Sequence, residues 1–413
     1  MTEVRRWCGA LAIALFSAGG VSAAREPHGV ILSHSFDPAR AAQLGEIVAR
    51  FNAGNPLDQI DLQRAGDSDP KAPTLLIVAA GEVADLRRSR RVRPLHQVMA
   101  QAGLPLKRVR GEGIDAADTL DSRGRRLGLP IGLHTPLLFV NRNAFRAAGL
   151  DPDSPPRTWK SLQDTLTTLV EAGHACPYTV ARPSWVMLDN VSARHHLAVT
   201  RTAGRAERLS VNGMLQVRHV ALMASWVRAR YLHLFGRGDE AEARFARGEC
   251  TVLAASSASW PGLRQSAGFE LGVSQLPYYD DMPEPPGATL VDGASLWMVA
   301  GKSRKDYRTA ARFVRFLLEP DNQLHWQRAT GFLPLSPAGV FTSASVDTTQ
   351  PNLRVASDQL RLGARMRRVV PSSLPSSLTV RNIIEDELDG VWAGVQPAKQ
   401  ALDNAVTRAA AAR

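Results

Sequence analysis

Histidine, acidic and serine side chains are the usual catalytic groups of hydrolases, and the 413-residue sequence contains two adjacent pairs of them, His195-His196 and Asp280-Asp281. Adjacent residues do not share a helix face, because surface neighbours on a helix lie three or four positions apart. The sequence also lacks the HExxH and GxSxG patterns that place a metal or a nucleophile beside a base. We therefore predict no enzyme, no metal site and no cofactor, and keep a secreted hydrolase only as an alternative to test.

Two cysteines, Cys176 and Cys250, follow the N-terminal segment. Neither lies in a CxxC pattern or beside a set of His and Asp residues, so the sequence does not indicate zinc binding or a nucleophile. In an oxidising compartment such a pair can form one disulfide. Two buried thiols packed as small hydrophobic groups are the other possibility, and the sequence leaves both open.

Arginine dominates the charge of the chain. Lys plus Arg number 50, of which six are lysines, against 39 Asp plus Glu, for a net charge of +11. The excess fits an anionic partner or a biased composition. Two basic runs, residues 87–93 and 365–368, would suit a secreted polyanion-binding protein, but no aromatic-interleaved or zinc motif accompanies them. We predict no nucleic-acid partner.

Residues 1–23 have the pattern of a cleaved secretory signal peptide. Arg5 and Arg6 precede a short apolar run, and Val21-Ser22-Ala23 is a small-x-small cleavage pattern. The run is shorter than the roughly 20 residues that a membrane-spanning helix needs, and no later run approaches that length. We expect an exported protein that does not span a membrane.

Short apolar runs alternate with amphipathic stretches, which is the pattern of an α/β protein. A chain of this length exceeds what one hydrophobic core supports, so two large lobes are expected. Strands are predicted at 29–34, 59–63, 74–79, 127–130, 137–141, 250–255, 271–276 and 293–299, and helices at 41–51, 143–148, 159–172 and 307–318. Thr158 fits the N-cap of the third helix and Gly173 its C-cap.

Five motifs, in order and spacing, resemble the extracellular solute-binding proteins (family 1) of ABC importers, and among them most closely the periplasmic receptors for sn-glycerol-3-phosphate. The motifs are FNAGNP (51–56), NRNAFRAAGLDPDSPPRTW (141–159), FARGEC (245–250), GASLW (293–297) and WQRATGFLP (326–334). Each motif alone is short, but the resemblance extends over nearly the whole mature chain, through residues 385–388 and Val391-Trp392.

The resemblance implies a two-lobed α/β periplasmic-binding-protein fold (type II), with a hinge between the lobes and a ligand cleft at their interface. Lobe one is expected at residues 25–138 plus 292–337, and lobe two at 139–291 plus 338–413. The implied function is to capture sn-glycerol-3-phosphate or a related glycerophosphodiester in the periplasm and deliver it to a membrane permease pair with a cytoplasmic ATPase. We expect a monomer, and a sugar or oligosaccharide ligand is the alternative.

Three family ligand contacts match this sequence, at Ser256, Gly293 and Arg381. A forked guanidinium at Arg381 suits a phosphate group, and a glycine at 293 lets the backbone approach a ligand closely. Local alternatives exist: Arg381 is spaced for an ion pair with Glu385 on one helix face, and Ser256 is a plausible turn residue or N-cap.

The other family contacts are changed. They fall on Phe332 in place of Tyr, His134 in place of Ser, Ser68 or a neighbour in place of Tyr, and Ala80 in place of Glu, while residues 67–71 replace a family helix. Loss of the Tyr and Glu groups weakens polyol recognition unless His134 and Glu82 substitute, because sites built on hydrogen bonds reject mismatched ligands. The exact ligand therefore stays open.

Aromatic and imidazole groups complete the predicted site. Trp185 and Phe332 are expected as stacking faces, which would also suit a choline-like ammonium group. His134 is expected to donate to a phosphate or to titrate near neutrality. Core packing of the two aromatic rings and a purely structural histidine are the corresponding alternatives.

Overall fold

The computed structural model describes residues 28–67, 72–107, 119–203, 206–334, 350–362 and 377–412. The predicted signal peptide (1–23), Ser68 and the basic run 365–368 lie outside the described residues. Within these ranges, no helix has the length and apolar character needed to cross a membrane.

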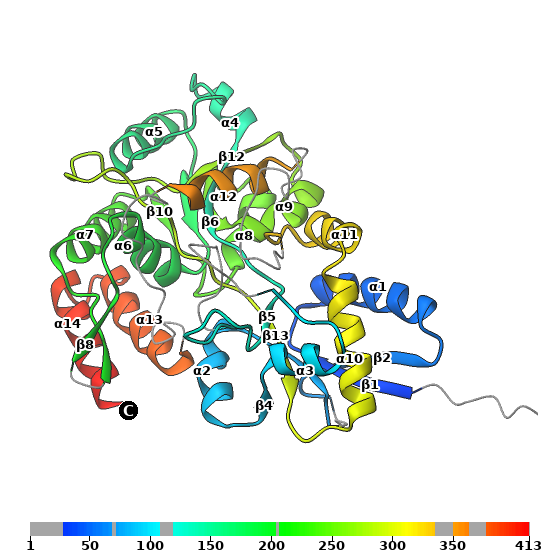
Figure 1. Cartoon of the computed structure of the whole chain (residues 1–413). Helices are drawn as coiled ribbons and strands as arrows, with labels where there is room; N and C mark the ends of the chain where they lie inside the picture. Colours follow the sequence, from blue (N-terminus) through cyan, green and yellow to red (C-terminus); the bar gives the residue numbers. More distant parts are fainter. Residues whose placement is uncertain are drawn as a thin grey trace, which may run out of the picture.

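The first sheet is built mainly from the N-terminal part of the chain (Figure 1). Its strand order is β2 (Asp58–Arg64), β1 (His28–His34), β3 (Leu75–Val78), β13 (Ser295–Val299) and β4 (Val92–Arg93), with β5 (Leu129–Pro130) also paired to β13. The first three strands are parallel, whereas β13 is antiparallel to β3 and pairs Ser295 with Val78. A strand from late in the chain thus completes the N-terminal sheet.

Helices cover this sheet with apolar faces. They are α1 (Pro38–Gly54), α2 (Ala80–Arg88), α3 (Leu95–Gln101), α10 (Arg304–Leu317) and α11 (Pro320–Thr330). Helix α1 buries Leu44, Ile47, Val48 and Phe51, which recur on one face with helical spacing. The Phe51 ring meets the Phe313 ring of α10 edge to face, with centroids 5.2 Å apart. This contact joins the first helix of the lobe to a helix 250 residues later.

Helix α10 begins three residues before the predicted start at 307. Ser303 explains the difference, since its hydroxyl accepts from the Asp306 amide at 3.1 Å and the Asp306 carboxylate accepts from the Ser303 amide at 2.9 Å. This reciprocal capping box starts the helix earlier than the apolar pattern alone indicates.

The second sheet comes from the middle of the chain. Its strand order is β10 (Leu232–His233), β7 (Tyr178–Val180), β11 (Val252–Ser256), β6 (Pro136–Asn141) and β12 (Leu271–Gln275). Strand β6 is buried along its whole length because alternate side chains enter two different cores. Leu138 and Val140 face one core, and Leu137 and Phe139 face the other.

The helices of the second lobe supply these two cores and a third apolar cluster. They are α4 (Arg142–Ala147), α5 (Trp159–Glu171), a π-helix (Trp185–Asn190), α6 (Val191–Arg194), α7 (Met214–Arg228), α8 (Glu240–Ala246), α9 (Trp260–Ser266), α12 (Pro351–Arg361), α13 (Leu378–Trp392) and α14 (Ala398–Ala411). The third cluster is formed by α13 and α14 with part of α7. The predicted N-cap is confirmed, because the Thr158 hydroxyl accepts from the Ser161 amide at 3.0 Å and α5 follows. A hairpin of β8 (Thr200–Ala203) and β9 (Ala206–Leu209) packs beside α14.

The two sheets lie in separate lobes of the molecule, joined by three passages of the chain (Figure 1). The chain leaves the first sheet between β5 and β6, returns between β12 and β13, and crosses again between α11 and α12. The first two passages pair with each other, since His134 and Asp292 exchange backbone hydrogen bonds of 2.9 and 3.0 Å. The predicted two-lobed α/β fold is confirmed.

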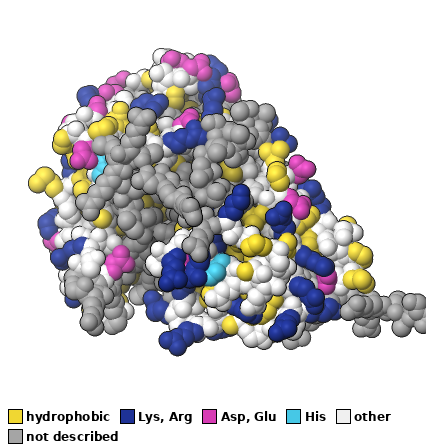
Figure 2. Space-filling view, in the orientation of Figure 1, with side chains coloured by type: hydrophobic (Ala, Val, Ile, Leu, Met, Phe, Trp, Pro, Cys, Tyr) yellow, Lys and Arg dark blue, Asp and Glu magenta, His cyan; other side chains and the backbone are white. Residues whose placement is uncertain are grey.

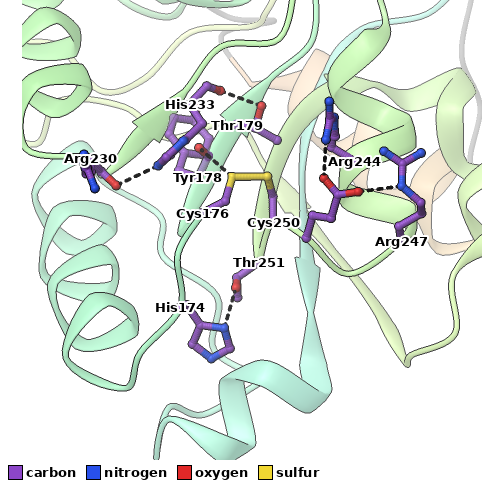
Figure 3. The surroundings of a disulfide bond; sticks show 11 residues. His174, Cys176, Tyr178, Thr179, Arg230, His233, Arg244, Arg247, Cys250 and Thr251 are labelled. Atoms are coloured by element: carbon purple, nitrogen blue, oxygen red, sulfur yellow. Dashed lines mark hydrogen bonds and ion pairs between the residues drawn. A yellow bond between two sulfur atoms is a disulfide. The ribbon is translucent and has the colours of Figure 1, made fainter.

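A disulfide joins Cys176 and Cys250 in the second lobe (Figure 3). Tyr178 of β7 pairs in parallel with Val252 of β11. Cys176 lies two residues before Tyr178, and Cys250 lies two residues before Val252. The strand register therefore places the two cysteines opposite each other, and the Thr251 amide donates to the Cys176 carbonyl at 3.0 Å beside the bridge. Both cysteines are buried, 7% and 0% exposed.

Candidate functional site

A cavity of about 440 Å³ lies between the lobes, where strands of both sheets end. From the first lobe it is lined by the segments that follow β1 and β3 and by the segment that precedes β13. From the second lobe it is lined by residues that follow β7 and by the last residue of β11. Loops at the carboxyl ends of parallel strands are the usual ligand-binding edge of α/β sheets.

The structure brings together most of the predicted site. His134, Ser256, Gly293, Phe332 and Arg381 all line the cavity. Ala80, which replaces the family glutamate, and Glu82, two positions later, line it as well at the start of α2. Trp185 is not among the lining residues, and Ser68 lies outside the described part of the chain.

Arg381, on the first turn of α13, is held by groups behind the cavity wall. Its guanidinium lies 2.9 Å from the carboxylate of Asp189 and donates to the Ser184 hydroxyl at 2.8 Å. Ser184 in turn donates to Glu385. The spacing of Arg381 and Glu385 suggested a direct ion pair. Instead, the guanidinium pairs with the buried Asp189 of the π-helix, and the Ser184 hydroxyl bridges Arg381 and Glu385.

Burial shifts the pKa of both carboxylates beside Arg381, those of Asp189 and Glu385. It raises the pKa of Asp189, while the charge of Arg381 acts against the shift. It also raises the pKa of Glu385, against which the Ser184 hydrogen bond and the Arg381 charge act. Arg381 is therefore the main group that opposes the effect of burial on the pKa of Asp189.

Arg182 is a cavity residue that the sequence analysis missed. It follows β7 with a backbone φ of 52°, an unusual conformation for a residue other than glycine. Its guanidinium lies 2.7 Å from the Asp292 carboxylate and 4.8 Å from the ring centre of Trp185. Because Arg182 follows a strand of the second sheet and Asp292 precedes a strand of the first, this ion pair joins the lobes at the cavity.

Trp185 supports the site from behind. Its side chain is buried, lies beneath Arg182 and meets the His134 ring edge to face at 5.1 Å between centroids. The expected ligand-stacking face is thus turned toward Arg182 and His134 in this structure. Trp185 positions the cation and the imidazole that line the cavity.

His134 is a neutral group at this site. Burial lowers its pKa to about 3, and the charges of Arg182 and Arg40 lower it further while Asp292 acts against them. The expectation that His134 titrates near neutrality is therefore wrong, because the imidazole sits in a buried and partly cationic setting. Its Nδ1 atom is buried and has no hydrogen-bond partner among the described residues.

Ser256 and Gly293 lie on opposite lobes at the cavity. The Ser256 hydroxyl accepts from the Ala258 amide at 3.1 Å, so the local N-cap role holds, and among the described residues no acceptor takes its own hydrogen. Gly293 has a φ of 144°, and a Cβ there would lie 2.0 Å from the Gly132 carbonyl oxygen. The close approach of the segments that contain Gly132 and Gly293 therefore requires a glycine at 293, independently of ligand binding.

Phe332 follows α11 and closes one side of the cavity with Arg40 of α1. The Arg40 guanidinium lies 5.5 Å from the centre of the Phe332 ring and 2.8 Å from the Asp37 carboxylate. Phe332 also packs against Phe36 and Trp326, with centroids 6.3 and 5.9 Å away. The ring serves both the core of the first lobe and the cavity wall.

The cavity is rich in charge but has no net positive charge, because its carboxylates outnumber its guanidiniums by four to three. Its cations are Arg40, Arg182 and Arg381, and its carboxylates are Asp37, Glu82, Asp239 and Asp292. Each guanidinium has a carboxylate partner, at Asp37, Asp292 and Asp189 respectively. Burial opposes ionisation of Asp292, but the Arg182 charge and hydrogen bond outweigh it and the pKa is lowered to about 2.

Metal binding has no support in the part of the chain that the structure describes, where no group of three or more His, Cys, Asp or Glu side chains is placed to hold an ion. The cavity can instead bind a small polar or anionic solute through guanidinium N–H groups, the Ser256 hydroxyl and His134.

Comparisons with known proteins agree with this arrangement. The family model for bacterial extracellular solute-binding proteins matches residues 62–350. The sn-glycerol-3-phosphate-binding periplasmic protein UgpB of Yersinia enterocolitica is 30% identical over 97% of this chain and 94% of its own length. UgpB of Escherichia coli is 30% identical over 91% of this chain and 90% of its own length.

Two solved structures share the fold. UgpB of Mycobacterium tuberculosis in complex with glycerophosphocholine has a TM-score of 0.74 at 22% identity, covering 93% of this chain and 98% of that one. The cyclic α-maltosyl-1,6-maltose binding protein of Arthrobacter globiformis has a TM-score of 0.71 at 21% identity, covering 94% and 99%. With the family match extending over most of its length, this chain belongs to the bacterial extracellular solute-binding proteins.

Proposed function

We propose that the protein is the periplasmic receptor of an ABC importer that captures sn-glycerol-3-phosphate or a related glycerophosphodiester. It would deliver this ligand to a membrane permease pair driven by a cytoplasmic ATPase. The observation that carries the proposal is the set of three guanidiniums, of Arg40, Arg182 and Arg381, around one interlobe cavity. The curated relatives named above support the same ligand class.

The charge balance of the cavity distinguishes two phosphate chemistries. A phosphate monoester carries close to two negative charges at neutral pH, whereas a phosphodiester carries one. Every cavity guanidinium is already paired with a carboxylate, and the lining carboxylates outnumber the guanidiniums by four to three, so the second negative charge of a monoester adds repulsion. We therefore propose a glycerophosphodiester as the preferred ligand.

The proposal also includes removal of the signal peptide and relative movement of the two lobes. The signal peptide of residues 1–23 would be removed on export, leaving a monomeric receptor with lobes at 25–138 plus 292–337 and 139–291 plus 338–413. The sheet strands at residues 28–130 and 295–299 on one side, and at 136–275 on the other, support this division, except that β6 begins at Pro136, three residues before the expected start of lobe two. Ligand would stabilise the closed form by binding it more tightly than the open form.

The receptor would not be an enzyme. The residue pairs that invited a hydrolase serve separate structural contacts: the His195 imidazole accepts from the Tyr279 amide at 3.1 Å, and Asp281 pairs with Arg218 at 2.8 Å. Neither contact belongs to the cavity lining.

Calorimetry on the mature chain tests the proposal with sn-glycerol-3-phosphate, glycerophosphocholine and maltotriose as ligands. We expect the diester to bind most tightly and to raise the melting temperature by mass action. Binding of maltotriose alone would replace the proposal with the sugar alternative. Release of glycerol phosphate from the diester by the purified protein would contradict a receptor without catalysis.

A further inference from the structure

A second hollow, of about 590 Å³, lies on the first lobe away from the interlobe cavity. It is bounded by β4, α3 and the start of α10, and Figure 1 shows the two helices side by side. Arg93, Arg304, Arg308, Gln101 and Tyr307 line it, and it shares no lining residue with the interlobe cavity. No acidic side chain is among the described residues of its wall.

One of its guanidiniums is held in place before any ligand arrives. Arg93 donates to the Gln101 side-chain oxygen at 2.7 Å and lies 4.7 Å from the centre of the Tyr307 ring. Tyr307 is itself buried, and its hydroxyl donates to the Val299 carbonyl at 2.9 Å. Arg93 is thus oriented without a carboxylate partner among the residues that the structure describes.

The other two cations lie one helical turn apart on α10. Arg304 and Arg308 are exposed, and the structure gives neither of them an ion pair with a described carboxylate. Arg312, one turn further along the same helix, does pair with Asp58 at 2.5 Å. Like charges four residues apart destabilise a helix, so an unpaired cluster of this kind carries a cost that a bound anion would remove.

We propose that this hollow, which we name the Arg93 site, binds a phosphate-bearing anion. Three guanidiniums supply forked donors that match phosphate oxygens, and Arg93 is pre-oriented by its aromatic and amide contacts. On the face of this lobe shown in Figure 2, Lys and Arg side chains are more frequent than Asp and Glu side chains. The anion can come from a free phosphate compound or from the headgroup of an anionic lipid, since both present the same group.

Matched double variants test the Arg93 site in the mature chain. Arg304→Gln/Arg308→Gln removes two cations of the site. Arg228→Gln/Arg264→Gln removes two exposed cations of the other lobe and is the control, because it changes the net charge equally. The interlobe cavity is intact in both, so any difference between them belongs to the Arg93 site. Arg93→Lys keeps the charge but loses the fork.

Two probes distinguish the sources of the anion. Calorimetry uses inorganic pyrophosphate, and flotation uses phosphatidylcholine vesicles with and without about 30 mol% phosphatidylglycerol. We expect binding of at least one anionic probe that falls as salt rises, weakens about tenfold or more in Arg304→Gln/Arg308→Gln, and persists in the control. Arg93→Lys should weaken it as well.

Pyrophosphate binding lost in the site variant would assign a soluble ligand, and vesicle binding lost in the same variant would assign a lipid headgroup. The melting temperature of Arg304→Gln/Arg308→Gln should not fall, since exposed unpaired cations are removed. Equal binding of both probes by the site variant and the parent, or no binding of either probe by the parent, would overturn the proposal. None of these outcomes depends on which ligand occupies the interlobe cavity.

Discussion

Arg381 and Asp189 form an ion pair of 2.9 Å, in which the Asp189 side chain is only 3% exposed. The pair joins the first turn of α13 to the π-helix of the second lobe. A residue predicted to bind ligand therefore also neutralises a buried charge.

Arg381→Ala should consequently lower stability as well as ligand affinity. It leaves Asp189 buried and unpaired, which costs about 3–5 kcal/mol of unfolding free energy at pH 8. Burial already raises the pKa of Asp189, so the neutral form is favoured in the folded variant and the loss should shrink as the pH falls to 5. Urea unfolding at both pH values measures this. Adding Asp189→Asn should restore stability without restoring affinity, whereas unchanged ligand affinity in Arg381→Ala would exclude Arg381 from the site.

Acid should destabilise the protein through two buried histidines. Burial lowers the pKa of both His134 and His219 to about 3 from the ordinary value of 6.5. Between these values the unfolded chain binds more protons, so this contribution is complete above pH 6.5 and is lost as the pH falls toward 3. Each histidine should remove about 1.4 kcal/mol per pH unit below pH 6. Melting temperatures from pH 7.5 to pH 5 measure the effect, and a flat profile would contradict it.

Gly293→Ala should be far more damaging than Gly301→Ala, although both glycines have positive φ angles of 144° and 79°. A Cβ at 293 would lie 2.0 Å from a backbone oxygen, whereas nothing lies within 4 Å of a Cβ at 301. We expect a loss of at least about 3 kcal/mol at 293 and about 1 kcal/mol at 301. Equal unfolding free energies for the two variants would argue against the crowded passage between the lobes.

Asp239→Asn should change ligand preference rather than fold. This carboxylate lines the cavity, is exposed, and has no ion-pair partner among the described residues. Removing its charge should raise affinity for sn-glycerol-3-phosphate relative to glycerophosphocholine by about three- to tenfold, because the monoester carries the extra negative charge. Glu171→Gln, an equal charge change on the exposed end of α5, is the control for the same calorimetric ratio. An unchanged ratio would contradict the charge argument.

Removal of the disulfide should destabilise the second lobe. The bridge closes a loop between cysteines 74 residues apart, for which chain entropy predicts about 4 kcal/mol. Reductant should lower the melting temperature of the parent and leave Cys176→Ser/Cys250→Ser unaffected. A parent protein insensitive to reductant under unfolding conditions would indicate that the thiols are not bridged in solution.

The strands were predictable because their apolar runs are local. The run at 137–141 corresponds to β6, and the run at 250–255 overlaps β11. The pairing of these strands was not predictable from composition, since it depends on residues more than 100 positions apart. Whether Cys176 and Cys250 form a disulfide could not be predicted for the same reason, because it depends on the register of β7 and β11.

Residues of the interlobe cavity were harder to predict than strands, because their contacts join distant parts of the chain. His134, Ser256 and Arg381 were identified through the order of family motifs, not through local spacing. Arg182 and Asp292 were missed because neither stands in a motif, and their contact appears only when the two lobes meet. The i+4 rule suggested Glu385 as the partner of Arg381, but a residue 192 positions away supplies the carboxylate.

The paired backbones of His134 and Asp292 have a mechanical consequence. Two of the three passages between the lobes form a short ribbon, and sliding one past the other would break both of their hydrogen bonds. Such a ribbon can bend but resists sliding of its two segments, so it favours rotation of the lobes about one axis over rotation in all directions. We therefore expect the open and closed forms to differ mainly by bending of this ribbon and not by sliding of one passage along the other.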